Sequence, residues 1–127
     1  MARILIVDDS EMFAEFTRAV LASDHEVDVV HNGRQAATLA LRNPYDLIIT
    51  DIFMPVADGY ETIRSMRRDL PKVPVIAMSG SEAGTPDFLA IAAKLGATRT
   101  IRKPFAASEL TRLVAATLAG SATPNAA

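Results

Sequence analysis

Five chemically reactive side chains stand at or just after the ends of apolar segments, where strands would end. They are Asp8, Asp9, Asp51, Ser79 and Lys103. In open parallel sheets, sites form beyond the carboxyl ends of the strands, at the crevice where strand order reverses. Taken singly, Asp51, Ser79 and Lys103 are each more often a turn, cap or surface residue, and Asp8 and Asp9 are as often solvated loop or cap acids as functional ones. Together they predict that three carboxylates, one hydroxyl and one ammonium group meet at one edge of a sheet.

Three carboxylates in one pocket repel one another and need a positive partner. At about 4 Å and an effective dielectric of about 20, each pair costs ~4 kcal/mol. The single ammonium of Lys103 does not offset this repulsion, whereas a hard divalent cation does. A ligand set of oxygens, without His or Cys, suits Mg²⁺, which keeps several waters and takes one or two carboxylates. We therefore predict a Mg²⁺ site.

A site of this composition can accept a phosphoryl group. An aspartate beside Mg²⁺ and a lysine is held ionised, so that its oxygen can attack phosphorus. The metal, the lysine and the hydroxyl can then share the charge on the transferring oxygens. The predicted chemistry is phosphoryl transfer to one carboxylate of the cluster.

The elements that must position these residues alternate regularly along the chain. Apolar segments predict strands at residues 4–7, 27–30, 47–49, 73–77 and 97–101. Helical patterns occupy residues 10–22, 33–42, 59–68, 85–95 and 106–119. The first, third and fourth strands are continuously apolar, which indicates burial on both faces, and the polar second and fifth strands are predicted at the edges. Right-handed crossovers then give a doubly wound α/β sandwich with a parallel sheet.

The bulk composition indicates one ordinary globular domain. The chain has 127 residues, of which 50% are hydrophobic, enough for a sizeable core. Its net charge of −2 gives no reason to expect nucleic acid or a membrane as a partner. No cysteine is present, and no apolar run approaches the ~20 residues of a membrane helix. We expect a cytoplasmic domain over residues 1–119, with residues 120–127 a disordered tail or the start of a linker.

Four motifs, in this order, resemble the response-regulator receiver domain. They are ILIVDDS at residues 4–10, DIFMP at 51–55 followed by DG at 58–59, VIAMS at 75–79, and KPF at 103–105. The resemblance covers residues 3–119. It implies a flavodoxin-like (βα)5 three-layer sandwich, whose five-stranded parallel sheet has the order 2-1-3-4-5.

The resemblance also implies a role for each acid. Asp51 corresponds to the aspartate that is phosphorylated. Asp8 and Asp9 match the acidic pair that positions Mg²⁺, with Asp9 the more direct ligand. The backbone carbonyl of Phe53 would be a further ligand of the metal.

The hydroxyl and the lysine match the switch residues of the family. Ser79 corresponds to the hydroxyl that bonds a phosphoryl oxygen, and Lys103 to the lysine that pairs with the phosphate and precedes a cis peptide bond. The donor would be a phosphohistidine on a sensor histidine kinase or a histidine phosphotransfer protein. The downstream target would bind the face formed by helix 85–95, strand 97–101 and helix 106–119.

Three positions depart from the family pattern. Thr100 stands where an aromatic residue usually precedes the lysine by three positions, so that output is expected to rely on backbone shifts or other contacts. Gly80 follows Ser79 and is expected to loosen the next loop. Ala106 replaces the usual capping residue, which predicts a poorly capped last helix.

Residues outside this pattern are predicted to be structural. Phe13, Phe16, Phe88 and Phe105 are expected in the core, and His25 and His31 are expected at the surface beside an edge strand.

Three other functions share parts of the pattern. A receiver-like interaction module that is not phosphorylated would not need the complete acid, hydroxyl and lysine set. An aspartate-nucleophile phosphohydrolase typically has a D-x-D-x-T motif at the first strand, where Asp8-Asp9-Ser10 stands here, and a flavin carrier needs a hydroxyl-rich phosphate loop there. We therefore predict a protein that is not an enzyme, apart from catalysing its own phosphorylation and dephosphorylation.

Overall fold

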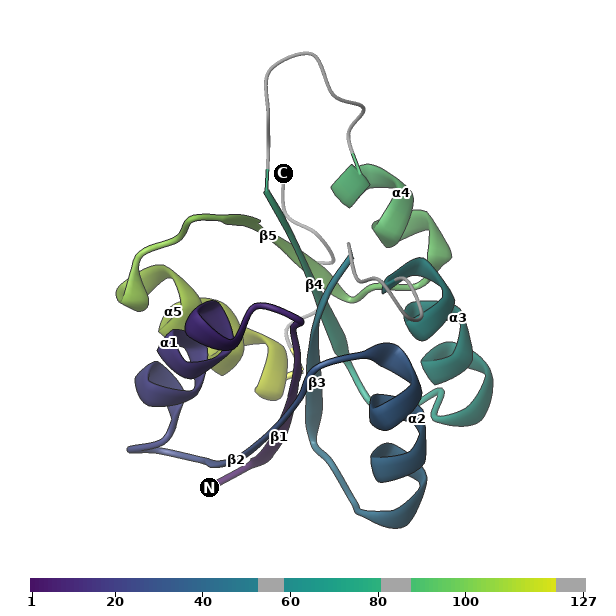
Figure 1. Cartoon of the computed structure of the whole chain (residues 1–127), viewed down its shortest axis with the longest axis horizontal. Coiled ribbons are helices and arrows are strands. Elements are labelled where there is room, and N and C mark those ends of the chain that lie inside the picture. Colours follow the sequence, from purple (N-terminus) through teal and green to yellow (C-terminus); the bar gives the residue numbers. More distant parts are fainter. Residues whose placement is uncertain (53–58, 81–87, 121–127) are drawn as a thin grey trace.

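A parallel sheet forms the centre of the molecule (Figure 1). The computed structural model describes residues 1–52, 59–80 and 88–120. Within these residues, five strands pair in the order β2-β1-β3-β4-β5, all parallel. The strands are β1 (Arg3–Val7), β2 (Glu26–Val30), β3 (Leu47–Asp51), β4 (Val75–Gly80) and β5 (Arg99–Lys103). The predicted order and the predicted edge strands are confirmed.

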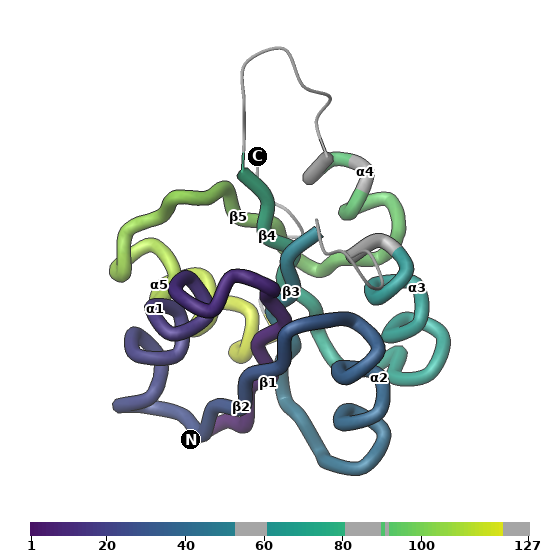
Figure 2. The backbone as a smooth tube through the Cα atoms, in the orientation of Figure 1, coloured from purple at the N-terminus to yellow at the C-terminus, as the bar shows by residue number. Residues whose placement is uncertain are grey.

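Helices cover both faces of this sheet. They are α1 (Glu11–Leu21), α2 (Gly33–Arg42), α3 (Gly59–Asp69), α4 (Phe88–Leu95) and α5 (Ala107–Leu118). Helices α1 and α5, from opposite ends of the sequence, lie side by side on one face, and α2, α3 and α4 lie on the other (Figure 2). Across the described ranges, no helix has the length and apolar character needed to cross a membrane. The architecture is the predicted flavodoxin-like three-layer sandwich.

Alternating side chains of the central strands build one core on each face of the sheet. In β1, Leu5 and Val7 point into the core beneath α2 and α3, whereas Ile4 and Ile6 point into the core beneath α1 and α5. Every residue of β3 is buried, as is every residue of β4 except Gly80. Burial on both faces explains why these strands read as continuous apolar runs.

Strands β4 and β5 begin two residues later than the predicted segments 73–77 and 97–101. Pro74 has no N–H to donate to a ladder, and β4 pairs with β3 only from Val75. The N–H of Ala97 donates to the carbonyl of Ala92, so that Ala97 completes the end of α4 and does not start a strand. Both strands also end later than predicted, at Gly80 and Lys103, so that Ser79 and Lys103 are the penultimate and last residues of their strands.

The helix ends follow the predicted capping pattern in part. The hydroxyl of Ser10 accepts a hydrogen bond from the N–H of Phe13 at 3.2 Å, which caps α1. Residue 106 has the extended backbone of an N-cap, but the side chain of Ala106 supplies no hydrogen bond to α5. The predicted start of helix 85–95 lies outside the described residues.

Replacing Ala106 with serine is expected to stabilise the fold. The backbone of residue 106 is already extended, and Glu109 stands three residues later, as a capping box requires. Ala106→Ser should therefore raise the free energy of unfolding by about 0.5–1 kcal/mol. Urea unfolding measures this change. The control is Ala107→Ser, which adds the same hydroxyl to an exposed residue just inside the helix. An equal gain in both variants would contradict the capping explanation.

Candidate functional site

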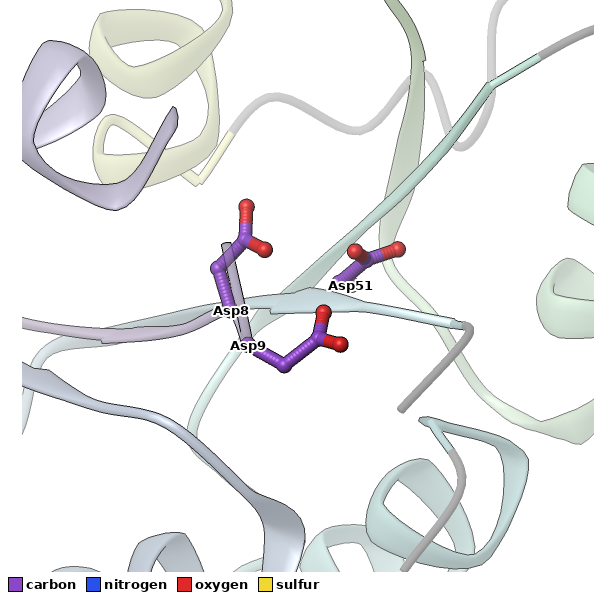
Figure 3. Close-up of side chains that lie close together, drawn as sticks. All are labelled: Asp8, Asp9 and Asp51. Atoms are coloured by element: carbon purple, nitrogen blue, oxygen red, sulfur yellow. The ribbon is translucent and has the colours of Figure 1, made fainter. Parts of the chain in front are cut away.

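Three carboxylates from β1 and β3 meet at the carboxyl edge of the sheet (Figure 3). Asp8 and Asp9 directly follow β1, and Asp51 ends the neighbouring strand β3, in which Thr50 pairs with Val7. One oxygen of each carboxylate lies within 4.8 Å of those of the other two. Asp8 and Asp51 are buried, whereas Asp9 is exposed to solvent. The predicted convergence of the three acids is confirmed.

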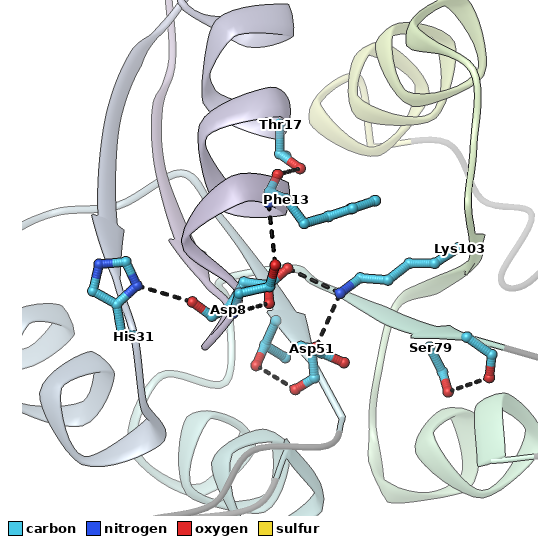
Figure 4. A network of polar contacts seen from close by, with 10 residues as sticks. Asp8, Phe13, Thr17, His31, Asp51, Ser79 and Lys103 are labelled. Carbon is cyan, nitrogen blue, oxygen red and sulfur yellow. Dashed lines mark hydrogen bonds and ion pairs between the residues drawn. The ribbon is translucent and has the colours of Figure 1, made fainter.

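Lys103 reaches this acid cluster from the end of β5 (Figure 4). Its Nζ donates to Asp8 Oδ2 at 2.9 Å and to Asp51 Oδ2 at 3.0 Å. Burial alone would lower the pKa of the Lys103 ammonium. The hydrogen bond to Asp8 and the charge of Asp51 outweigh burial, so that the pKa is raised above the ordinary lysine value. The amine is therefore charged at neutral pH and bridges two buried acids.

Two contacts, one from a backbone amide and one from a histidine ring, hold Asp8 in place. Asp8 Oδ1 accepts a hydrogen bond from the N–H of Ser10 at 3.0 Å. Nδ1 of His31, which precedes α2, lies 3.0 Å from the carbonyl oxygen of Asp8. The contact of His31 was not predicted: the expected strand order places the end of β2 beside that of β1, but no residue pattern indicates that the His31 ring turns toward the carbonyl of Asp8.

The hydroxyl of Ser79 lies at the end of β4, beside the strand that carries Asp51. Met78 pairs with Asp51 in the sheet, and Ser79 follows it. This buried hydroxyl donates to the carbonyl of Gly80 at 3.1 Å and is not directed at Asp51 (Figure 4). A Cβ added at Gly80 would meet no atom of the described residues within 4 Å, so none of these residues packs closely enough to require glycine. The sheet brings Ser79 to the same edge, but its hydroxyl does not bond the acids.

Four further positions named in the sequence analysis belong to the segments around the site. The Lys103-Pro104 peptide bond is cis, as predicted. Phe53, whose backbone carbonyl is predicted to bind the metal, lies outside the described residues. Phe16 was predicted in the core, but 41% of its surface is exposed, and its ring packs against those of Phe13 and Phe105. Thr100 is half-buried and pairs with Ala77.

The donor set fits Mg²⁺ in chemistry and in charge. Three ionised carboxylates and one ammonium leave a formal charge of −2, which one divalent cation balances. All of the donors are oxygens, which Mg²⁺ prefers, and the exposed carboxylate of Asp9 leaves access to water. Asp9 forms no ion pair with another described residue, so its charge is available to a cation.

The family model of the response regulator receiver domain matches residues 4–115 of this chain. The chain belongs to this family. Receiver domains are signalling switches of two-component systems. The match includes the acid cluster, the hydroxyl and the lysine described above, and its length covers nearly the whole sandwich.

Curated relatives contain this receiver domain as one part of a longer chain. This chain is 35% identical over 112 residues to a protein-glutamate methylesterase/protein-glutamine glutaminase of Rhodospirillum centenum, and the match covers 86% of this chain and 28% of that protein. It is 32% identical over 109 residues to the transcriptional regulatory protein CusR of Escherichia coli, covering 85% of this chain and 47% of that protein. This chain therefore spans less than half of each of these two relatives.

Solved receiver structures match this receiver domain along most of both chains. The chemotaxis response regulator CheY4 of Vibrio cholerae has 28% sequence identity and a TM-score of 0.82, with 91% of this chain and 97% of that chain covered. A response regulator receiver domain protein from Clostridium thermocellum has 26% identity and a TM-score of 0.86, with 94% and 96% covered. The fold is thus that of known receiver domains.

Removing the amine of Lys103 is expected to destabilise this receiver domain in the absence of Mg²⁺. Lys103→Met removes the ammonium that bonds two buried carboxylates, which costs about 3 kcal/mol. Because the folded-state pKa of Lys103 is raised, its stabilising effect is complete below the ordinary value of 10.5 and is lost as pH rises through the folded value. Urea unfolding in EDTA should therefore show the same loss at pH 7 and at pH 9.

The control for this variant is Lys72→Met, which removes an exposed lysine from the turn before β4. It should change the free energy of unfolding by less than about 0.5 kcal/mol. Equal stabilities for Lys103→Met and Lys72→Met would show that the amine of Lys103 does not stabilise the two acids.

Proposed function

We propose that this receiver domain is the phosphoacceptor switch of a two-component or phosphorelay system, and that Asp51 accepts the phosphoryl group from a phosphohistidine donor. One observation carries this proposal. The buried carboxylate of Asp51 is bonded to the ammonium of Lys103 and lies beside two further acids at the carboxyl edge of the sheet. A cluster of this kind holds a nucleophile ionised next to a positive group that can bind phosphate.

In the proposed reaction, an oxygen of the Asp51 carboxylate attacks phosphorus. The new O–P bond forms as the P–N bond of the phosphohistidine breaks, and the electron pair of that bond returns to the imidazole nitrogen, which can take up a proton. Lys103 keeps Asp51 ionised and lies beside it, where its ammonium can pair with a phosphoryl oxygen. The reverse of the switch is hydrolysis, in which water attacks the acyl phosphate and frees the carboxylate of Asp51.

The acid cluster would hold the Mg²⁺ that this reaction needs. Asp8, Asp9 and Asp51 would provide the carboxylates, with Asp9 the more direct ligand. The backbone carbonyl of Phe53, which lies outside the described residues, is proposed as a further ligand from the family pattern. When bound, the ion neutralises charge on the oxygens of the transferring group.

The proposed output begins at Ser79. Its hydroxyl, now bonded to the carbonyl of Gly80, would turn to bond a phosphoryl oxygen. The new group adds a charge of about −2, which biases a two-state equilibrium of the segments around the site. We propose that a target protein binds the face formed by α4, β5 and α5. Because Thr100 stands where the family usually has an aromatic residue, backbone shifts or other contacts would transmit the effect of phosphorylation to this face.

A receiver module that is not phosphorylated is the alternative, and the complete site disfavours it. Burying a lysine between two acids costs desolvation free energy. A module that is not phosphorylated gains no function from this arrangement. An aspartate-nucleophile phosphohydrolase is also disfavoured, because its nucleophile would follow the first strand, whereas the acid that we propose here ends β3. We therefore propose that the domain is not an enzyme towards other molecules.

Intact-mass spectrometry with acetyl phosphate tests the proposal. Acetyl phosphate replaces the phosphohistidine donor, so that no partner is needed. In the presence of Mg²⁺ the protein should gain one adduct of roughly 80 Da, the mass of a phosphoryl group. The same mixture with EDTA in place of Mg²⁺ should give none. No adduct under either condition would reject the proposed function, and equal adducts in both would reject the metal's role.

A further inference from the structure

The ammonium of Lys103 has a third neighbour besides the two acids: the ring of Phe13. Lys103 Nζ lies over this ring, 4.3 Å from its centroid (Figure 4). We infer that Phe13 is a positioning residue for phosphoryl transfer, and that its ring keeps the ammonium beside Asp51. The inference rests on the proposed function, because it assigns a task within that reaction.

The ring of Phe13 is itself held firmly. It packs edge-to-face on Phe105, with ring centroids 5.2 Å apart and an interplanar angle of 89°. Phe105 is buried and stands only two residues after Lys103. The N–H of Phe13 donates to the capping hydroxyl of Ser10, and its carbonyl accepts from the hydroxyl of Thr17. The first turn of α1 therefore places the ring on the segment that carries the lysine.

The ring offers a contact that the acids do not. An ammonium has three N–H donors, and two of them bond Asp8 and Asp51. The face of an aromatic ring is negative and attracts a cation, but it has no formal charge. A divalent ion at the acid cluster would share the negative charge of Asp8 and weaken its bond to Lys103. The ring contact is independent of that charge, so it would keep the amine in place when metal and phosphate bind.

Three variants separate this role from ordinary packing. Phe13→Leu keeps an apolar side chain but removes the aromatic face, and Phe13→Tyr keeps that face. Phe16→Leu is the matched control, because Phe16 belongs to the same ring cluster, with its centroid 5.8 Å from that of Phe13 and 6.2 Å from that of Phe105. No cation–π contact joins Phe16 to Lys103 in the described residues.

The rate of phosphorylation by acetyl phosphate at saturating Mg²⁺ is the first measurement. A cation–π contact corresponds to a rate factor of about 5-fold when exposed and about 30-fold when desolvated, so Phe13→Leu should slow the reaction by roughly 5- to 30-fold. Phe13→Tyr should restore the rate, and Phe16→Leu should stay within about twofold of the wild type. The Mg²⁺ affinity should be the same in all four proteins, since no acid is changed.

Proton NMR of the lysine side chains gives a second measurement that packing alone would not change. The ring current of Phe13 should move the ε-methylene protons of Lys103 upfield of those of the exposed Lys72 and Lys94 side chains. The displacement should vanish in Phe13→Leu and persist in Phe16→Leu. Wild-type Lys103 protons at the same position as those of Lys72 would overturn the inference without any variant, whether or not Phe13→Leu folds.

The outcomes distinguish the inference from the function on which it rests. A phosphorylated wild type with an equally fast Phe13→Leu variant overturns only the role of Phe13. A slow Phe13→Leu that Phe13→Tyr does not rescue assigns Phe13 to packing alone, which also overturns it. A wild type that takes no phosphoryl group rejects the proposed function itself.

Discussion

The Asp51→Asn variant is expected to gain no phosphoryl group when it is incubated with acetyl phosphate and Mg²⁺. An amide keeps the size of the carboxylate but carries no negative charge, so it is a poor nucleophile towards phosphorus. Removing the nucleophile of a reaction typically slows it by at least about 10³-fold. Intact mass should therefore show the adduct on the wild type and none on the variant within the same time.

The Asp51→Asn substitution can keep the hydrogen bond to Lys103, so it tests the negative charge of residue 51 separately from its contacts. The amide oxygen of Asn at position 51 can still accept a hydrogen bond from Lys103, which now donates to Asp51 Oδ2 at 3.0 Å. The matched control is Asp24→Asn, which makes the same change at an exposed acid in the turn after α1. The control should be phosphorylated like the wild type. An adduct of equal yield on Asp51→Asn would place the acceptor at another residue.

The Asp9→Ala variant is expected to lose most of its affinity for Mg²⁺. Asp9 is the exposed member of the acid cluster and neither bonds nor pairs with another described residue, so its removal leaves the fold intact. Changes to groups that merely support a metal ligand already weaken binding 10- to 100-fold, so the loss of a ligand should cost at least about 10-fold. Isothermal titration calorimetry of the metal-free proteins measures the affinity.

Thermal unfolding checks the same prediction by linkage. An ion that binds only the folded state stabilises it, by about 2.7 kcal/mol at 100 times its dissociation constant. Adding Mg²⁺ should raise the Tm of the wild type and leave that of Asp9→Ala almost unchanged. Glu11→Ala removes an exposed acid two residues away and should keep the full response. An unchanged Mg²⁺ affinity in Asp9→Ala would remove Asp9 from the ligand set.

The surroundings of the site were harder to predict than the site. The sequence places the amide of Ala97 at the start of a strand, yet it completes the last turn of α4, because the pairing of β5 with β4 begins only at Arg99. Phe16 has the spacing of a core residue, but the helix is turned so that part of the ring meets solvent. Periodicity reports which residues prefer to be buried, whereas strand register and helix rotation depend on the partner elements.

The sequence by itself determined the order of the elements, the two edge strands and the meeting of Asp8, Asp9, Asp51 and Lys103. Parallel strands carry their carboxyl ends at one edge of a sheet, so these residues, which stand at the ends of three strands, approach one another wherever they stand in the chain. Only the tertiary structure decided which atoms touch: that Lys103 bridges Asp8 and Asp51, and that the ring of Phe13 lies beneath its amine. Such contacts depend on the packing of α1 against the end of β5, which no local pattern of residues encodes.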